Sequence, residues 1–288
     1  MNDAIKVMLD RYNCQSVNDY ENALKEIIQE IALLGLWRSK FFEKAAFYGG
    51  SALRILYGLD RFSEDLDFSL LKKDKKFSIE SYCKAVEEEL KSFGFSVSVQ
   101  KKEKTVKTNI ESAFIKGGTL NNMIIIEVPE IVKKKIHSGR GLKIKLEVDI
   151  DPPADFKTEA KYILHPMPFS VNAYALPYLY AGKMHAILCR SWSNRVKGRD
   201  WYDLVWYIAR GESLSLKHLY MRMKQSGHLN KYRSLTEYRF IQLLQDKIDS
   251  TDFENAKKDV EPLLKDPLSI VVWSKEFFST ICKKIKII

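Results

Sequence analysis

Two aspartates, Asp65 and Asp67, are separated by a single residue in the segment 61–68. Residues two apart on a strand point to the same face, so both carboxylates would project together while Leu66 and Phe68 enter the core. Two adjacent negative charges are unfavourable unless a cation lies between them, and Mg²⁺ is typically held by carboxylates together with substrate phosphates. We therefore predict that Asp65 and Asp67 bind Mg²⁺. A solvent-facing acidic strand would show the same pattern.

A glycine turn, Gly49-Gly50-Ser51, precedes these aspartates. It follows a predicted strand at 45–48 and leads into apolar residues at helical spacing. Glycine lets the backbone approach a ligand closely, and the first N–H groups of a helix bind phosphate. We predict that this turn holds the phosphates of a nucleotide, with Arg54 one helical turn further on. The alternative is a plain turn in which Ser51 caps the helix.

A third carboxylate is expected on the predicted strand 143–150, where acidic residues alternate with apolar ones. Asp149 is the preferred third metal ligand because it is central and flanked by β-branched residues, and Glu147 is the alternative. Either side chain would act as a metal ligand or as the base for an incoming hydroxyl. A phosphate-binding turn beside such carboxylates suits attack on a nucleoside triphosphate.

Lys183 lies in the apolar stripe of a predicted helix, four residues from Leu179 and from Ile187. A lysine in that position needs an anion, either a carboxylate or a triphosphate, unless it extends its ammonium group to water. Further along, Asp200 and Asp203 are one helical turn apart and share a face. We predict that Asp200 orients Lys183 or the nucleophile, with a plain helix cap as the alternative.

Basic and aromatic residues surround Asp200. Arg195, Lys197 and Arg199 are predicted to bind an acidic acceptor. Trp192, Trp201 and Trp206 are candidates to stack on bases, with the core as the favoured place for Trp206. The whole chain of 288 residues has a net charge of +10, with the excess in clusters. Clustered positive charge attracts polyanions such as RNA, although a lysine-rich but ordinary surface gives the same count.

Composition narrows the class of protein. Hydrophobic residues make up 45% of the chain, as in a globular protein, and no apolar run is long enough to span a membrane. The N-terminus lacks a signal region, and the four cysteines form no C-x-x-C pair. This spacing argues against a zinc site or a disulfide framework and predicts a cytoplasmic protein.

The order of predicted elements gives a mixed α/β fold with an α-helical C-terminal lobe. Residues 1–165 are expected to form an α/β domain with N-terminal helices, and 166–288 a helical domain, with the boundary in a proline-rich stretch. Within the first domain the apolar segment Met123 to Val128 is predicted to be a strand.

These motifs, in this order, resemble the AbiEii-like (MenT-like) nucleotidyltransferases of the DNA polymerase β-like superfamily. The resemblance rests on Gly49-Gly50-Ser51, the segment 61–68, Lys183 and the segment 199–204, and covers residues 45 to 210. Members of this family are toxins of bacterial toxin–antitoxin and phage-defence systems. The resemblance implies a minimal nucleotidyltransferase sheet, Mg²⁺ and a nucleoside triphosphate donor.

The resemblance also assigns roles by position. It implies that Gly50 and Ser51 hold the triphosphate and that Asp65 and Asp67 hold the metal. It also implies that Lys183 contacts phosphate and that Asp200 is essential for activity. Some relatives modify the acceptor end of tRNA, which implies an RNA acceptor here, and a cognate antitoxin is a further implied partner.

Two other functions fit part of the pattern. A small-molecule nucleotidyltransferase of the antibiotic-modifying kind would need an acidic acceptor pocket, whereas the second half of this chain is basic. A non-catalytic nucleic-acid-binding protein would gain nothing from adjacent carboxylates beside an anion. Nucleotide transfer to RNA is therefore the preferred prediction.

Overall fold

The computed structural model describes residues 3–103, 108–135, 139–190, 196–229 and 234–288. The chain divides into two compact units, each described here by itself. The first comprises Met1–Gly58, Phe62–Pro152 and Glu159–Ala173, and the second comprises Leu59–Arg61, Pro153–Thr158 and Tyr174–Ile288. The three-residue segment Leu59–Arg61 thus belongs to the second unit although its neighbours in the chain on both sides belong to the first.

The first unit combines helices with one mixed sheet. Its elements are α1 (Asp3–Asp10), α2 (Val17–Arg38), η1 (Phe41–Glu43), β1 (Ala45–Tyr48), α3 (Gly49–Tyr57), β2 (Leu66–Leu70), α4 (Glu80–Ser92), β3 (Val97–Lys101), β4 (Ile110–Gly118), α5 (Thr119–Ile125), α6 (Glu130–Lys133), β5 (Gly141–Asp149), β6 (Thr158–Ile163) and β7 (Phe169–Tyr174).

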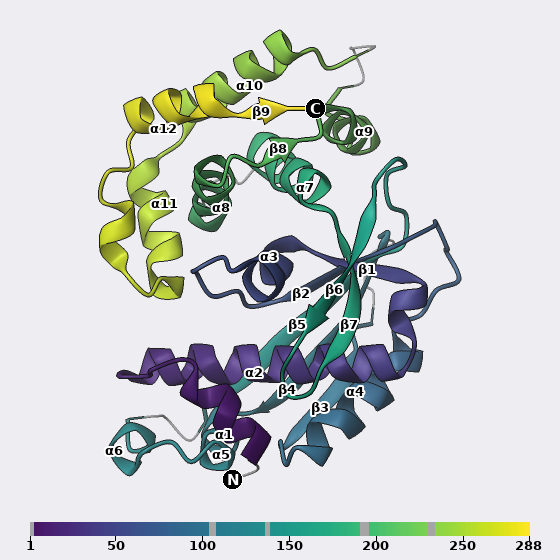
Figure 1. The fold of residues 1–288 in the computed structure, drawn as a ribbon, viewed down its shortest axis with the longest axis vertical. Coiled ribbons are helices and arrows are strands. Elements are labelled where there is room, and N and C mark those ends of the chain that lie inside the picture. The colour runs from purple at the N-terminus through teal and green to yellow at the C-terminus, as the bar shows by residue number, and fades with distance from the viewer. Residues whose placement is uncertain (1–2, 104–107, 136–138, 191–195, 230–233) are drawn as a thin grey trace. The chain divides into compact units, whose positions relative to one another are not determined.

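The seven strands of this sheet follow the order β3-β4-β5-β2-β1-β7-β6 (Figure 1). β2 is central: it pairs antiparallel with β1 and parallel with β5. The register sets Asp67 opposite Tyr48 on β1 and opposite Glu147 on β5. The sheet therefore brings the end of β1, the aspartate strand and the predicted third carboxylates into neighbouring positions, and the prediction of a mixed α/β fold is confirmed.

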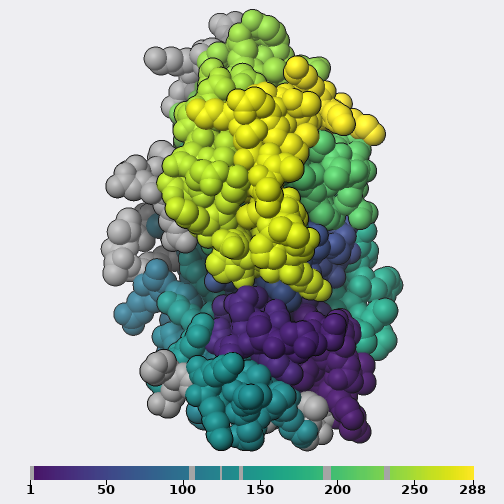
Figure 2. Space-filling view, turned by 90° about the vertical axis from the view of Figure 1, so that its left-hand side faces the viewer, coloured from purple at the N-terminus to yellow at the C-terminus, as the bar shows by residue number. Residues whose placement is uncertain are grey.

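The long helix α2 covers the sheet together with α4. Ser16 begins α2 with a capping box in which the Ser16 side chain and Asp19 exchange hydrogen bonds with the backbone. Ile27, Ile31 and the other apolar residues of α2 are fully buried in the same core cluster as the strands. α2 also packs against α5, and the surfaces of these helices adjoin in Figure 2 (purple and teal).

The predicted strand at Met123 to Val128 is wrong, because Met123 lies in helix α5. Met123, Ile126 and Val128 are nevertheless buried, so this apolar segment belongs to the core. A short apolar run does not distinguish a strand from a helix, since both bury such residues. The Asn122 side chain, bonded to both the N–H and the carbonyl of Ser96, fixes this helix against the residues before β3.

The second unit is predominantly helical, as predicted. Its elements are α7 (Leu176–Cys189), α8 (Gly198–Ala209), β8 (Ser213–Leu214), α9 (Leu216–Gln225), α10 (Glu237–Ser250), α11 (Phe253–Val260), η2 (Glu261–Leu263), η3 (Pro267–Ile270), α12 (Lys275–Ile281), η4 (Cys282–Lys284) and β9 (Lys286–Ile287).

Close packing of α8 on α11 and α12 organises the second unit. Trp201 is buried against Phe253 and Phe278, whose rings stack on each other. Gly198, at the start of α8, lies so close to the Ala256 carbonyl that a Cβ atom would overlap it. None of the helices in the described part of the chain is long and apolar enough to cross a membrane.

Candidate active site

The glycine turn and the second aspartate are in direct contact in the first unit. Gly49 has φ +82, a conformation that glycine adopts readily and other residues rarely. A Cβ atom at Gly49 would lie 2.5 Å from Oδ2 of Asp67. Glycine is therefore required here twice, once for the backbone conformation and once for the approach of the carboxylate.

Helix α3 begins at Gly49, two residues earlier than Ser51, where the sequence predicted it to start. The residue before the helix, Tyr48, provides no side-chain cap. Because the first turn of any helix has N–H groups without partners inside the helix, this N-terminus attracts an anion. The Asp67 carboxylate approaches the same turn, so helix N–H groups and a carboxylate lie side by side here. Phosphate binding by the turn and metal binding by Asp67 stay predictions.

Ser51 connects the turn to the first aspartate. Its side chain is fully buried, and its hydroxyl donates a hydrogen bond to the backbone carbonyl of Asp65. The alternative in which Ser51 caps the helix is wrong, because Tyr48 holds the cap position. The hydroxyl instead fixes the residue immediately before β2, where Asp65 lies.

The candidate third carboxylates lie on β5 beside β2. In the parallel register Glu147 is opposite Asp67, and Asp149 is opposite Ser69. Glu147 forms an ion pair with Lys145 at 2.6 Å, and Asp149 accepts a hydrogen bond from the Asp151 N–H at 3.0 Å. The register gives Glu147 the position nearest to Asp67 along the strands. The choice between Glu147 and Asp149 as metal ligand stays a prediction.

Arg54, predicted to contact the nucleotide, has a structural partner in the first unit. Its Nε donates to Oε2 of Glu26 on α2 at 2.8 Å, and its guanidinium lies over the Phe62 ring. Charged groups this well paired and largely buried fix the orientation of a helix. Arg54 therefore anchors α3 to α2, and its role toward a nucleotide stays a prediction.

In the second unit, Lys183 has the anionic partner that its apolar position requires. Its Nζ lies 2.8 Å from Oδ1 of Asp200 and 2.8 Å from Oδ2 of Asp203, and both carboxylates are buried. Of the two anions considered from the sequence, the structure shows the carboxylate. Lys183 thus has its ammonium group fixed in position by two side chains of α8.

Arg61 completes this cluster, with Nε and Nη2 bound to the two oxygens of Asp203 at 2.6 and 2.7 Å. Both side chains are at most 1% exposed. Arg190 contacts the other aspartate, Asp200, at 3.3 Å. Three cations and two anions leave a net charge of +1 in the cluster, which favours an additional anion nearby.

The roles of Arg61 and Asp203 were not predicted from the sequence. The available signal was the pair Asp200 and Asp203 on one helical face, since two buried carboxylates require more positive charge than one lysine. Nothing in the sequence identified Arg61 as the second cation, because it is 142 residues from Asp203.

The cluster sets the charge state of Asp200. Burial by itself would raise the pKa of this carboxyl group, but the charges of Lys183 and then Arg190 outweigh burial and hold the pKa below its ordinary value of 3.8. Asp200 is therefore a carboxylate at neutral pH, and so a hydrogen-bond acceptor for Lys183.

The predicted acceptor-binding residues give a mixed result. Arg195 lies outside the described residues. Lys197 lines a cavity of about 130 Å³ with Arg190, Asp200 and Lys247, which makes its wall rich in cations. Arg199 is half-buried on α8. Of the stacking candidates, Trp192 lies outside the described residues. The prediction that Trp201 stacks on a base is wrong, because its ring is in the core of the second unit.

The glycine turn and the aspartate strand of the first unit, and the buried lysine of the second, are the features from which a nucleotidyltransferase was predicted. Comparison with known proteins identifies the family. Residues 31–279 match the family model described as nucleotidyl transferase AbiEii toxin, type IV toxin–antitoxin system. The chain belongs to this family and is a nucleotidyltransferase.

Solved structures of similar fold come from Helicobacter pylori. The crystal structure of JHP933 has 16% sequence identity and a TM-score of 0.47, covering 90% of this chain and 89% of that one. A second solved structure, described as that of an H. pylori nucleotidyltransferase, has 16% identity and a TM-score of 0.43, with 88% of each chain covered. No curated protein matches the sequence.

We predict that Arg61→Met destabilises the protein by about 3–5 kcal/mol, because it leaves a buried carboxylate with half of its positive partners. Arg190→Met is the matched control, since Arg190 is 51% exposed and its pair is worth under about 1 kcal/mol. Urea unfolding of both variants and the wild type measures the difference. Equal, small effects of the two substitutions would contradict the account of the cluster.

The lowered pKa of Asp200 gives a pH dependence. A carboxylate whose pKa is depressed in the fold stabilises it above the ordinary value, here 3.8, and loses that contribution as the pH falls through the folded pKa. We expect Asp200→Asn to be less stable than the wild type at neutral pH, with the difference shrinking below pH 3.8. Urea unfolding across this range tests it, and a difference that does not change with pH is the opposing result.

Proposed function

We propose that this nucleotidyltransferase transfers a nucleotide from a nucleoside triphosphate to an RNA acceptor, tRNA being the preferred candidate, in a reaction that requires Mg²⁺. One observation carries the proposal: Asp67 lies against Gly49 at the N-terminus of a helix whose N-cap residue, Tyr48, makes no side-chain capping hydrogen bond. A carboxylate in that position would only repel a triphosphate, unless a metal ion lies between the two anions.

The residues of the first unit fit such an ion. Asp65 and Asp67, with Glu147 or Asp149, offer oxygen ligands from two neighbouring strands, which are the ligands that Mg²⁺ prefers. When bound, the ion supplies positive charge to the phosphate undergoing attack.

The N–H groups at the start of α3 would bind the triphosphate. Gly49 and Gly50 present backbone without side chains at this turn, and Ser51 holds the turn to Asp65 through its buried hydroxyl. The geometry of the turn thereby controls both the phosphates and the first metal ligand. This explains why a small, rigid turn is needed and why larger residues would disturb the carboxylates as well.

We assign a phosphate contact to Lys183 and its positioning to Asp200 and Asp203. Two carboxylates of α8 hold the Lys183 ammonium group, and Arg61 holds Asp203. A fixed cation stabilises the charge that develops on a leaving pyrophosphate without first having to be ordered. The net positive charge of the cluster supports this assignment.

An RNA acceptor is supported by charge. The chain carries a net charge of +10, and the cavity lined by Lys197, Arg190 and Lys247 offers three cations to a phosphate backbone. The family is that of toxins in type IV toxin–antitoxin systems, which supports a toxin role and a cognate antitoxin for this chain. We propose the cytoplasm, where tRNA is found, as the place of action.

The experiment is a transfer assay with Mg²⁺, each labelled nucleoside triphosphate and total tRNA. We expect label on RNA for the wild type, and at least about a 100-fold loss for Asp67→Asn. Asp74→Asn, a change at an exposed aspartate shortly after the same strand, is the matched control and should keep activity. Transfer to small molecules alone would redirect the proposal, and RNA binding without any transfer would overturn it.

A second prediction separates the carboxylate contact from backbone strain. Gly49→Ala and Gly58→Ala both place a side chain at positive φ and should each cost about 1–2 kcal/mol in stability. Only at Gly49 would the new Cβ meet Asp67, whereas none of the described atoms lies within 4 Å at Gly58. We therefore expect Gly49→Ala to lose nucleotide transfer and Gly58→Ala to keep it.

A further inference from the structure

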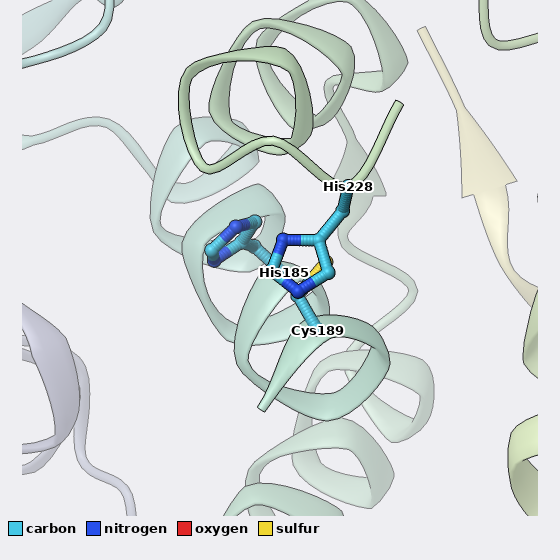
Figure 3. A group of neighbouring side chains, drawn as sticks. All are labelled: His185, Cys189 and His228. Atoms are coloured by element: carbon cyan, nitrogen blue, oxygen red, sulfur yellow. The ribbon is translucent and has the colours of Figure 1, made fainter. Parts of the chain in front are cut away.

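A second cluster of metal-binding side chains lies in the second unit, and its residues take no part in the proposed reaction. His185 and Cys189 are one turn apart on α7, and His228 follows the end of α9. One ligand atom from each residue lies within 4.8 Å of the other two. Figure 3 shows the two imidazole rings and the thiol converging from α7 and the segment after α9.

The hydroxyl of Ser226 connects the two histidines. Its oxygen lies 2.8 Å from Nε2 of His185 and 2.9 Å from Nδ1 of His228. The same hydroxyl donates to the Met223 carbonyl at 3.2 Å, and it has only one proton to give. When the Ser226 proton goes to the Met223 carbonyl, both rings donate to the Ser226 oxygen.

This arrangement selects the tautomer of each ring. If His185 carries its proton on Nε2 and His228 carries its proton on Nδ1, the other nitrogen of each ring has a free lone pair. Histidine ligands of metals almost always donate their second ring nitrogen to such an outer partner, which orients the ring. Ser226 therefore has the position of an outer partner shared by two histidine ligands.

The donor set is two imidazoles and one thiol, which suits Zn²⁺ better than Mg²⁺. Bond lengths of about 2.1 Å to nitrogen and 2.3 Å to sulfur place the ligand atoms of a tetrahedral zinc site about 3.5 Å apart, and the three ligand atoms here lie within 4.8 Å of one another.

We propose that His185, Cys189 and His228 form a Zn²⁺ site that joins α7 to the segment after α9. The Cys189 thiol releases its proton on binding, and a water molecule takes the fourth ligand position, since His228 is exposed to solvent. α7 also carries Lys183, so the ion stabilises the helix that presents this lysine. This site was not predicted from the sequence, where paired cysteines were the sign of zinc considered, because two of its three ligands are histidines.

Zinc binding by the full-length protein, with any purification tag removed, tests the proposal. Equilibrium dialysis against Zn²⁺ alone, followed by metal analysis, should give a single tightly bound ion per chain and a raised melting temperature. Replacement of Zn²⁺ by Co²⁺ should give a thiolate-to-cobalt charge-transfer band, which reports Cys189 directly. His228→Ala changes an exposed residue, so this variant should fold and should bind Zn²⁺ at least about 10-fold more weakly.

Cys189→Ser should abolish the charge-transfer band, and Ser226→Ala should weaken binding by about 10–100-fold, as loss of an outer partner does. The matched controls are Cys14→Ser and His165→Ala, which remove a cysteine and a histidine of the first unit and should bind Zn²⁺ as the wild type does. Unchanged Zn²⁺ affinity in both His228→Ala and Cys189→Ser, or no binding by the wild type, would overturn the proposal. These measurements do not depend on nucleotide transfer.

Discussion

The approach of the Asp67 carboxylate to the backbone of Gly49 is the constraint on which the candidate site depends. A negative side chain beside the N-terminus of α3 is stable in the fold, because the first N–H groups of a helix carry partial positive charge. A triphosphate bound to the same N–H groups would be repelled by the Asp67 carboxylate, so a cation is required between the two. The glycine turn, the Ser51 hydroxyl and the pairing of β1 with β2 all maintain this contact.

The second unit depends on a different electrostatic balance. Asp203 is fully buried and is compensated by a bidentate contact from Arg61 and by Lys183. Arg61 lies in the chain between α3 and β2, yet it belongs to the second unit through this contact. The ion pairs hold the Lys183 ammonium group in one position. A cation that is already ordered stabilises charge on a phosphate without the cost of being reoriented during the reaction.

The residues that could be predicted from the sequence are those whose type and local spacing carry the signal. The strand expected around Asp67 is observed as β2, which begins directly after Asp65, and the anionic partner of Lys183 was expected from its apolar helical position. The Arg61–Asp203 pair and the His185, Cys189 and His228 cluster join residues distant in the chain, which local patterns do not report. The prediction of a strand at Met123 to Val128 was wrong because a short apolar run without clear periodicity fits either a helix or a strand.

The central claim is that the turn at Gly49 and the Asp67 carboxylate bind a triphosphate through a shared metal ion. The most direct measurement is calorimetric binding of a non-hydrolysable nucleoside triphosphate analogue, with and without Mg²⁺, to the wild type and to Asp67→Asn. The account predicts that Mg²⁺ strengthens binding to the wild type at least about 10-fold and that Asp67→Asn loses this gain. Equal affinities with and without Mg²⁺, in both proteins, would contradict it.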